Sequence, residues 1–355
     1  MKEKILIAMS GGVDFSVAAY LMQRQGCDCI GVTMRLFLNS DAGMEKGRTC
    51  CSLDDVEDAR SVACRLGIPY YVFNFTEDFR EQVIKRFADA YEHGATPNPC
   101  IDCNRFLKFA RLIRRARELG CDAVATGHYA RIEQKNGRFL LKKAVDPGKD
   151  QSYVLYSLTQ EQLAYLRFPL GEKTKAEVRE TAEALGFSNA RKPDSQDICF
   201  VPDGDYAAFI RRYTGKNYPD GPLTVRDGNR LGTHHGIIGY TVGQRRGLGV
   251  SSSTRLYVTD ILPEENRVIL GPADALLRRE LDVGNVNFIA WNTPPREFRA
   301  CVRLRYHQSE QWADITVTEP TRIHIRFDEP QRAVTRGQAA VLYDGDIVLG
   351  GGEIL

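Results

Sequence analysis

The sequence has no apolar run of membrane-spanning length, no internal repeat, no low-complexity tract and little excess charge of either sign. Its first apolar run, residues 5–9, is far too short for the core of a signal peptide. We therefore expect a cytoplasmic protein that does not contact a membrane. The net charge of +2 excludes no class of partner, because a near-neutral total can hide a local basic patch.

Two common nucleotide-binding signatures are also absent. No stretch ends in the Walker pattern Gly-Lys-Ser/Thr, and none carries the dinucleotide pattern Gly-x-Gly-x-x-Gly. A phosphate-binding loop in this chain therefore follows neither of these two patterns.

What is present is the composition of a globular protein. Hydrophobic residues make up 43% and charged residues 26% of the 355 residues, which are too many for one compact core, so we expect two or three domains. The ten cysteines do not suit a disulfide framework in a cytosolic chain. They favour thiol chemistry or metal binding, with a role as small core residues as the alternative for most of them.

The first part of the chain alternates strands and helices. This alternation predicts a parallel sheet with helices on both faces, whose ligands bind where loops leave the carboxyl ends of the strands. The predicted strands span residues 5–9, 29–34, 70–75 and 121–126, and the predicted helices span residues 17–25, 53–66, 77–92 and 104–119.

The second part of the chain is richer in turns and strands. Asn136-Gly137 predicts a hairpin, and Thr174 with Glu177 forms a capping box that opens a helix to about Leu185. A short helix is predicted over residues 206–213, a loop-dominated stretch over residues 215–249, and strands over residues 256–261, 267–270, 299–306, 312–317, 322–327 and 339–343. We predict an α/β nucleotide domain over residues 1–205, a small central domain over 206–272 and an all-β barrel over 273–355.

A candidate phosphate loop, Ser10-Gly11-Gly12-Val13-Asp14, lies between the first predicted strand and the first predicted helix. Glycines let the backbone approach an anion, and a helix N-terminus offers unpaired N–H groups and the positive end of its dipole. The alternative is a tight turn with Asp14 as the helix N-cap. The position of the loop at the start of an α/β domain favours phosphate binding.

The second candidate site is a cysteine pair. Cys100 and Cys103 form a C-x-x-C that follows a proline-stiffened loop and directly precedes a helix, where a thiol has a lowered pKa. Cys199 lies in another loop-like stretch before a short helix. Two thiols that meet can deliver sulfur: one carries a persulfide, and the other attacks it and forms a disulfide.

Metal binding by these cysteines stays open as an alternative. A structural zinc site lacks a second pair of ligands at suitable spacing, and the adjacent Cys50 and Cys51 are awkward as two ligands of one tetrahedron. Cys100, Cys103 and Cys199 could instead hold three irons of an iron–sulfur cluster.

Eight stretches in the same order along the whole chain resemble the tRNA-specific 2-thiouridylases, which belong to the ATP-pyrophosphatase superfamily with its adenine nucleotide alpha hydrolase-like fold. Besides Ser10–Asp14, these are residues 50–59, 96–109, 125–129, 149–153, 195–200, 240–249 and 330–352. The resemblance implies that ATP, with Mg²⁺, adenylates the C2 carbonyl of the anticodon wobble uridine and that sulfur then replaces the oxygen. It also implies tRNA and a sulfur donor, either a cysteine desulfurase or a sulfur-relay protein, as partners.

The resemblance also assigns site residues. Cys103 aligns with the nucleophile, Cys199 with the persulfide carrier, and Asp14 is a further catalytic residue that could contribute to Mg²⁺ binding. The residues implied at the nucleotide are Ala8, Met9, Ser10, Gly11, Gly12, Val13, Asp14, Phe15, Met34 and Gly127. Those implied at the tRNA are Asn98, Pro99, Cys100, His128, Lys149, Asp150, Gln151, Arg305, Tyr306 and Gln338. The family pattern has Ser where this chain has Phe15, so a hydroxyl donor is missing and a bulky ring occupies the loop.

Charge patterning adds two candidate contacts with the RNA backbone. The helix after the cysteine pair is strongly basic, and Gln244-Arg245-Arg246 lies in a Gly-rich loop. The basic residues of the helix are Arg105, Lys108, Arg111, Arg114, Arg115 and Arg117. A solvated helix surface is the alternative. His234-His235 has no partner set that suggests a metal, and we interpret it as structural.

Overall fold

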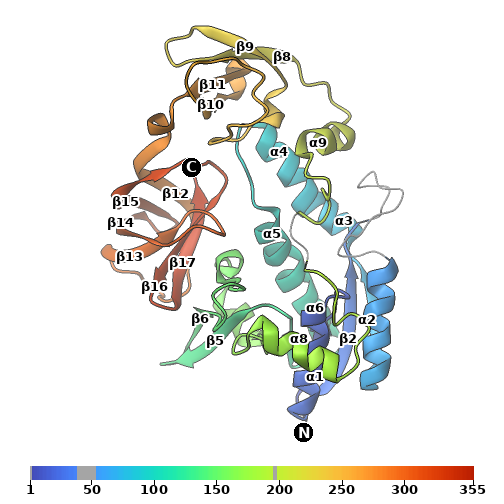
Figure 1. Cartoon of the computed structure of the whole chain (residues 1–355). Coiled ribbons are helices and arrows are strands. Elements are labelled where there is room, and N and C mark those ends of the chain that lie inside the picture. Colours follow the sequence, from blue (N-terminus) through green and yellow to red (C-terminus); the bar gives the residue numbers. More distant parts are fainter. Residues whose placement is uncertain (1, 38–52, 195–197) are drawn as a thin grey trace.

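The computed structural model describes residues 2–37, 53–194 and 198–355. A parallel sheet with helices forms the N-terminal part, a four-stranded sheet lies at the far end of the molecule, and an antiparallel barrel lies beside the long helices that join them (Figure 1). Among the described residues no helix is both long and apolar enough to cross a membrane.

The N-terminal sheet is wholly parallel, as predicted. Its strand order is β3-β2-β1-β4-β7, with bounds Tyr70–Asn74, Asp28–Arg35, Lys4–Ala8, Ala123–Ala125 and Leu166–Arg167. Leu6 of β1 packs into one core cluster and Ile5 and Ile7 into another, and all three are fully buried. A strand covered on both faces reads as a continuous apolar run, which is the pattern of β1.

Helices cover both faces of this sheet. α1 (Val13–Arg24), α2 (Leu53–Leu66) and α8 (Lys175–Ala184) contribute to the cluster that contains Ile5, and α6 (Leu112–Glu118) to the cluster that contains Leu6. α8 begins with the predicted capping box, in which the Thr174 side chain and the Glu177 side chain bond each other's backbone N–H groups.

The two longest predicted helices form, but each changes its hydrogen-bonding pattern internally. The first consists of α3 (Thr76–Phe79), the π-helical segment η1 (Arg80–Ile84) and α4 (Lys85–Glu92). The second consists of α5 (Pro99–Asp102), the π-helical segment η2 (Cys103–Arg111) and α6. π-Helical stretches are rare and cluster at functional sites.

The central part is a sheet rather than a loop-dominated domain. After α9 (Tyr206–Thr214), the strands have the order β10-β11-β8-β9, with bounds Tyr257–Leu262, Arg267–Gly271, Asp220–Thr224 and Arg230–His235. The prediction for residues 215–249 is therefore wrong for β8 and β9, since β8 pairs with β11 and β9 pairs with β8. His234 is structural, as we interpreted it: it is fully buried and its Nε2 lies 2.9 Å from the Asn266 carbonyl oxygen.

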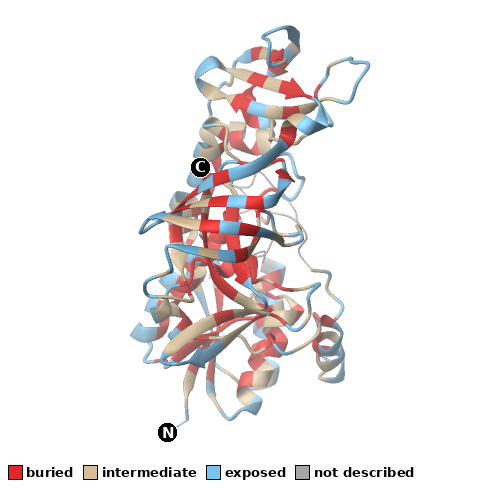
Figure 2. Ribbon diagram, turned by 90° about the vertical axis from the view of Figure 1, so that its left-hand side faces the viewer, coloured by how far each residue is buried: buried red, intermediate tan, exposed pale blue. Residues whose placement is uncertain are grey.

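The C-terminal part is a closed antiparallel barrel. Its strands are β12 (Leu277–Phe288), β13 (Glu297–Arg303), β14 (Gln311–Glu319), β15 (Arg322–Arg332), β16 (Ala339–Asp344) and β17 (Ile347–Ile354). β12 pairs with both β15 and β17 and so closes the barrel. Buried and exposed residues alternate along its strands (Figure 2).

The predicted hairpin belongs to this barrel sheet. Its strands β5 (Ala130–Lys135) and β6 (Arg138–Lys143) extend from the nucleotide domain, and β6 pairs with β17 through Leu141 opposite Val348. The barrel is therefore joined by main-chain hydrogen bonds to the N-terminal part of the chain. The remaining short elements are η3 (Ser152–Leu155), α7 (Gln160–Tyr165), η4 (Ile237–Gly239), η5 (Pro263–Glu265) and η6 (Ala273–Leu276).

Candidate functional site

The candidate phosphate loop connects β1 to α1 and leaves the start of the helix uncapped. The N-cap residue is Gly12, which offers no side chain, so Asp14 is not the N-cap and that alternative is wrong. Gly11 has a φ of +74°, and a Cβ there would lie 2.5 Å from the Asp55 carbonyl oxygen. A Cβ on Gly127 would lie 2.9 Å from the backbone of Asp14. Gly11 and Gly127 must therefore both be glycine, because a larger residue at either position would clash with the neighbouring backbone.

Asp14 is held by two partners from distant parts of the chain. Its carboxylate accepts a hydrogen bond from the Tyr129 hydroxyl at 2.7 Å, and its two oxygens lie 2.7 and 2.8 Å from the Lys175 ammonium. Burial, together with the adjacent Asp14 carboxylate, raises the pKa of Tyr129. Lys175 also contacts Asp194 at 2.7 Å. Asp14 is thus part of an ion-pair network rather than an open Mg²⁺ ligand.

Asp194 lies at the other end of this network. Its carboxylate accepts hydrogen bonds from Lys149 and Lys175, both at 2.7 Å, and Arg179 lies 3.2 Å away. Burial alone would raise the pKa of Asp194, but the hydrogen bonds and charges of the two lysines outweigh it and lower that pKa. This carboxylate therefore stays ionised.

The residues implied at the nucleotide gather at the carboxyl ends of neighbouring strands. Ala8 ends β1, Met34 lies near the end of β2, and Gly127 follows β4. Gly127 lies directly against the backbone of Asp14 in α1, at the edge of the sheet where an α/β sheet binds ligands.

Phe15 and Ser16 both serve the packing of the loop. The Phe15 ring packs against the core cluster on one face of the sheet and lies edge-on, 6.4 Å from the His128 ring. Ser16 is 1% exposed; its Oγ donates to the Gly12 carbonyl at 3.2 Å and accepts from the Asn189 amide at 2.9 Å. The Ser16 hydroxyl, which follows Phe15 in the chain, therefore stabilises the loop through these two hydrogen bonds.

The cysteine pair begins a helix with a side-chain cap. The Asn98 side chain accepts the Cys100 N–H at 3.1 Å, and Pro99 occupies the first helical turn. The helix changes from α to π hydrogen bonding at Cys103. Cys100 is exposed. The burial of Tyr306, together with the charges of Asp150 and Cys100, raises the pKa of Tyr306 to about 12.

The structure brings the two predicted relay thiols into one hydrophobic cluster. Cys103 is 8% exposed and belongs to the cluster that contains Phe87 and Phe200. Cys199 packs against the same cluster, and so does Met34, one of the residues implied at the nucleotide.

The predicted metal ligands do not gather in this way. Within the described ranges no group of three or more His, Cys, Asp or Glu side chains is arranged to hold a metal ion. Cys100 is exposed, whereas Cys103 is enclosed by apolar side chains. The three thiols therefore do not fit the predicted iron–sulfur ligand set. Cys50 and Cys51 lie outside the described residues.

A barrel loop supports the proline loop in front of the cysteines. Gln338 donates to the Thr96 carbonyl at 2.7 Å, and the Thr96 N–H donates to the Arg336 carbonyl at 2.8 Å. Asn98 and Gln338 line one pocket of about 240 Å³ between this barrel loop and the helices. Two residues implied at the tRNA, which are 240 positions apart in the chain, thus share a pocket.

Several other residues implied at the tRNA make internal contacts. His128 is 4% exposed and its Nδ1 lies 2.7 Å from the Thr126 hydroxyl; burial, and to a lesser degree Lys108, holds the pKa of His128 well below its usual range. Arg305 donates to the Ala333 carbonyl at 2.7 Å. Gln151 accepts the Tyr129 N–H at 2.9 Å.

Asp150 is likewise an interior residue. Its side chain is 3% exposed, it accepts the Ser152 hydroxyl at 2.8 Å, and it pairs with Arg303 of the barrel at 3.3 Å. In this structure Asp150 joins the nucleotide domain to the barrel, and only Lys149 of the stretch 149–151 faces the ion-pair network of the phosphate loop.

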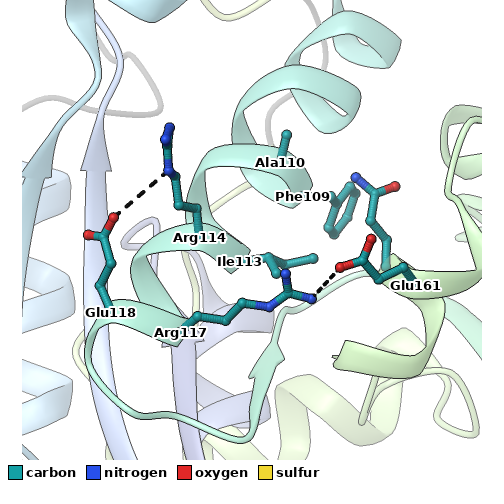
Figure 3. Close-up of a pocket in the computed structure, with 8 residues that line it drawn as sticks. Phe109, Ala110, Ile113, Arg114, Arg117, Glu118 and Glu161 are labelled. Carbon is teal, nitrogen blue, oxygen red and sulfur yellow. Dashed lines mark hydrogen bonds and ion pairs between the residues drawn. The ribbon is translucent and has the colours of Figure 1, made fainter.

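The arginines of the basic helix are largely neutralised by acids. Figure 3 shows Arg117 directed toward Glu161 and Arg114 toward Glu118 around a pocket of about 430 Å³. The first pair lies at 2.6 Å and the second at 3.9 Å. Arg111 and Arg115 also have acidic partners, both at 2.7 Å. These pairs favour a solvated, ion-paired helix surface over an RNA-binding one, whereas Arg245 and Arg246 are exposed.

Sequence reasoning did not single out Lys175 and Asn189, which contact the phosphate loop, or Asp194, which contacts Lys175. One signal was available for Lys175. It is the first residue of α8, where the positive end of the helix dipole disfavours a cation, so a lysine there needs anionic partners from elsewhere.

Comparison with known families divides the chain into three parts. Residues 3–203 match the tRNA methyl transferase HUP domain, residues 207–272 the tRNA methyl transferase PRC-barrel domain, and residues 278–354 the aminomethyltransferase beta-barrel domain.

Curated relatives match over the full length. The tRNA-specific 2-thiouridylase MnmA of Clostridioides difficile (strain 630) is 49% identical over 356 residues, covering 100% of this chain and 98% of the relative. A relative of the same name from Clostridium acetobutylicum is 45% identical and covers 100% of both chains. A solved 4-thiouridine synthetase in complex with RNA and ATP is 23% identical over 56% of this chain and 45% of that chain, with a TM-score of 0.38, too low to support an argument.

Proposed function

This chain belongs to the tRNA-specific 2-thiouridylase family, and from that premise we propose that it uses ATP to replace the C2 carbonyl oxygen of the tRNA wobble uridine with sulfur. The observation that carries the proposal is that Cys103 lies in one hydrophobic cluster and that Cys199 and Met34 both pack against that same cluster. An enzyme that only adenylates its substrate has no use for that pair.

The first step activates the uridine. The C2 carbonyl oxygen attacks the α-phosphorus of ATP, pyrophosphate leaves, and the oxygen becomes part of an AMP leaving group. The uncapped N–H groups at the start of α1 bind the phosphates, supported by the helix dipole. Mg²⁺ would arrive with the ATP phosphates and screen their charge, since Asp14 is already paired with Lys175.

The second step transfers sulfur. A cysteine desulfurase or a sulfur-relay protein loads Cys199 as a persulfide. The Cys103 thiolate attacks the Cys199 sulfur atom, a Cys103–Cys199 disulfide forms, and hydrosulfide leaves and attacks C2 as AMP departs. A dithiol reductant then returns both cysteines to thiols. The apolar wall around Cys103 keeps water from competing for C2.

The RNA is held by shape and phosphate contacts while the target base leaves the anticodon stack. Asn98 lines the pocket that the extruded base would approach, with Gln338 on the barrel side, and Pro99 and Cys100 follow Asn98 at the start of α5. The exposed Arg245 and Arg246 would contact the backbone. We propose that this reaction takes place in the cytoplasm.

Two assays test this function. Pyrophosphate release should require tRNA, and release that proceeds equally without tRNA would overturn the proposal. Cys103→Ser and Cys199→Ser should each abolish 2-thiouridine formation, measured by nucleoside mass spectrometry, while tRNA binding remains. Cys64→Ser is the matched control, because Cys64 is exposed on α2 and outside the site.

A further inference from the structure

Asn104, which follows Cys103 in the chain, is a buried polar residue with an acceptor that the fold does not use. Its side chain is 2% exposed, and its Nδ2 donates to the Val154 carbonyl at 3.3 Å. Its Oδ1 is also buried, and no donor among the described residues bonds to it. Buried polar atoms in proteins are nearly always hydrogen-bonded, so this oxygen requires an explanation.

The amide of Asn104 cannot find a partner by turning over. Reversal would place Oδ1 against the Val154 carbonyl, and two acceptors repel each other. Val154 belongs to η3, where the fully buried Tyr153 donates to the Ala339 carbonyl of the barrel at 2.9 Å. The segment that orients the amide is thus fixed by the barrel, and Oδ1 is held as an acceptor.

The position of Asn104 relates this acceptor to the reaction. Cys100 and Asn104 are four residues apart and therefore lie on the same side of the helix. Cys100 is exposed whereas Asn104 is buried, so the amide lies deeper than the Cys100 thiol. The Cα atoms of Asn104 and Cys103 are about 3.8 Å apart, as for any two consecutive residues. Asn104 therefore adjoins the proposed nucleophile.

The proposed reaction brings a matching donor to this place. The carbon that receives sulfur, C2 of the uridine, is bonded to N3, and N3 carries a hydrogen. When C2 approaches the thiols, the N3–H group approaches the residues beside Cys103. Cytosine has a lone pair at N3 and would present a second acceptor to the Asn104 oxygen. A site with a buried acceptor rejects a ligand that lacks the donor, because the acceptor then stays unpaired.

We propose that Asn104 is a specificity-determining residue whose Oδ1 accepts the N3–H of the target uridine and so selects uridine over cytidine. The inference rests on the proposed function, since it requires the target base beside Cys103. It places the choice of base in a residue of the cysteine helix.

The test compares the affinity of the full-length protein for three tRNAs that differ only in the wobble base: uridine, cytidine or 3-methyluridine. The unmodified protein should bind the uridine tRNA about five- to 150-fold more tightly than the cytidine tRNA, the range for one buried polar group left unpaired. 3-Methyluridine keeps both carbonyl oxygens but has a methyl group in place of the N3 hydrogen. Its tRNA should bind as weakly as the cytidine tRNA.

Asn104→Ala removes the oxygen and leaves room for the methyl group. This variant should lose most of the preference for uridine over cytidine, and it should bind the 3-methyluridine tRNA at least about fivefold more tightly than the unmodified protein does. A purely structural role of Asn104 would instead weaken the binding of all three tRNAs alike.

Asn189→Ala is the matched control. Asn189 is also 2% exposed, and its Oδ1 likewise has no donor among the described residues, but its amide bonds to Gly11 in the phosphate loop. Its replacement should leave the relative affinities for the three tRNAs unchanged.

Two results would overturn the inference. One is equal affinity of the unmodified protein for the uridine and cytidine tRNAs, a comparison that does not depend on the folding of any variant. The other is an Asn104→Ala protein that shows cooperative thermal unfolding and keeps the full preference for uridine. Pyrophosphate release that does not require tRNA would instead overturn the proposed function.

Discussion

Replacing Gly11 with alanine should disable the phosphate loop through its backbone alone. Gly11 has a φ of +74°, and its missing Cβ would lie 2.5 Å from the Asp55 carbonyl oxygen and 2.7 Å from the Asp55 Cα. Both neighbours are backbone atoms near the start of α2, so they cannot rotate away as a side chain would.

The size of the effect follows from two contributions. An alanine in the left-handed region costs about 1–2 kcal/mol. Forcing an extra carbon into a packed site costs about 1–3 kcal/mol more. Gly137 provides the matched control: its φ is +75°, and a Cβ there meets nothing within 4 Å. Gly137→Ala should therefore show only the first contribution.

Thermal unfolding and ATP binding together measure the difference. Gly11→Ala should lower the unfolding temperature by roughly 2–12 °C more than Gly137→Ala does, from about 2–4 °C for each kcal/mol in a domain of this size. It should also abolish tRNA-dependent pyrophosphate release, which Gly137→Ala should leave intact. Equal unfolding temperatures for the two variants, with ATP binding retained in both, would refute the close-approach argument.

Three further predictions concern the interior. Arg303→Met leaves the buried Asp150 carboxylate without its cationic partner, so the free energy of unfolding should fall by about 3–5 kcal/mol. Thermal or urea unfolding measures this loss. An unchanged free energy of unfolding would contradict the role of this ion pair. Burial keeps His128 neutral in the folded protein, whereas in the unfolded chain this side chain takes up a proton below a pKa of about 6.5. The free energy of unfolding should therefore decline as the pH falls through that value. His128→Gln should make this decline smaller when the melting temperature is measured as a function of pH. Gln338→Ala removes the bond to Thr96, worth about 0.5–1.5 kcal/mol, and should slow thiolation roughly two- to tenfold with ATP affinity unchanged; a loss of ATP affinity would place Gln338 elsewhere in the mechanism.

Local patterns in the sequence predicted the local elements well. Helix α2 spans Leu53–Leu66 as its apolar spacing predicted, and the capping box opens α8 at Lys175. β12 was missed because its first half is charged and exposed and carries no simple apolar alternation. The π-helical bonding that begins at Cys103 was also missed, because helical spacing of apolar residues does not distinguish it from an α-helix.

Long-range contacts explain what sequence reasoning missed at the site. The contact between Asp14 and Lys175 joins residues 161 positions apart, and no local pattern marks such a pair. The burial of His128 and Asp150 is equally invisible in the sequence, because it depends on contacts with distant parts of the chain. The role of the two cysteines stays a prediction; the structure places Cys103 in one hydrophobic cluster and Cys199 against it.

The pairing of β6 with β17 makes the three parts of the molecule difficult to separate. A fragment that ends at residue 272 would lose β17 and leave β6 with an unpaired row of N–H and C=O groups. Exposed strand edges of this kind recruit other chains and aggregate. The hairpin therefore makes the barrel a structural component of the nucleotide domain, and a shortened enzyme should precipitate rather than work slowly.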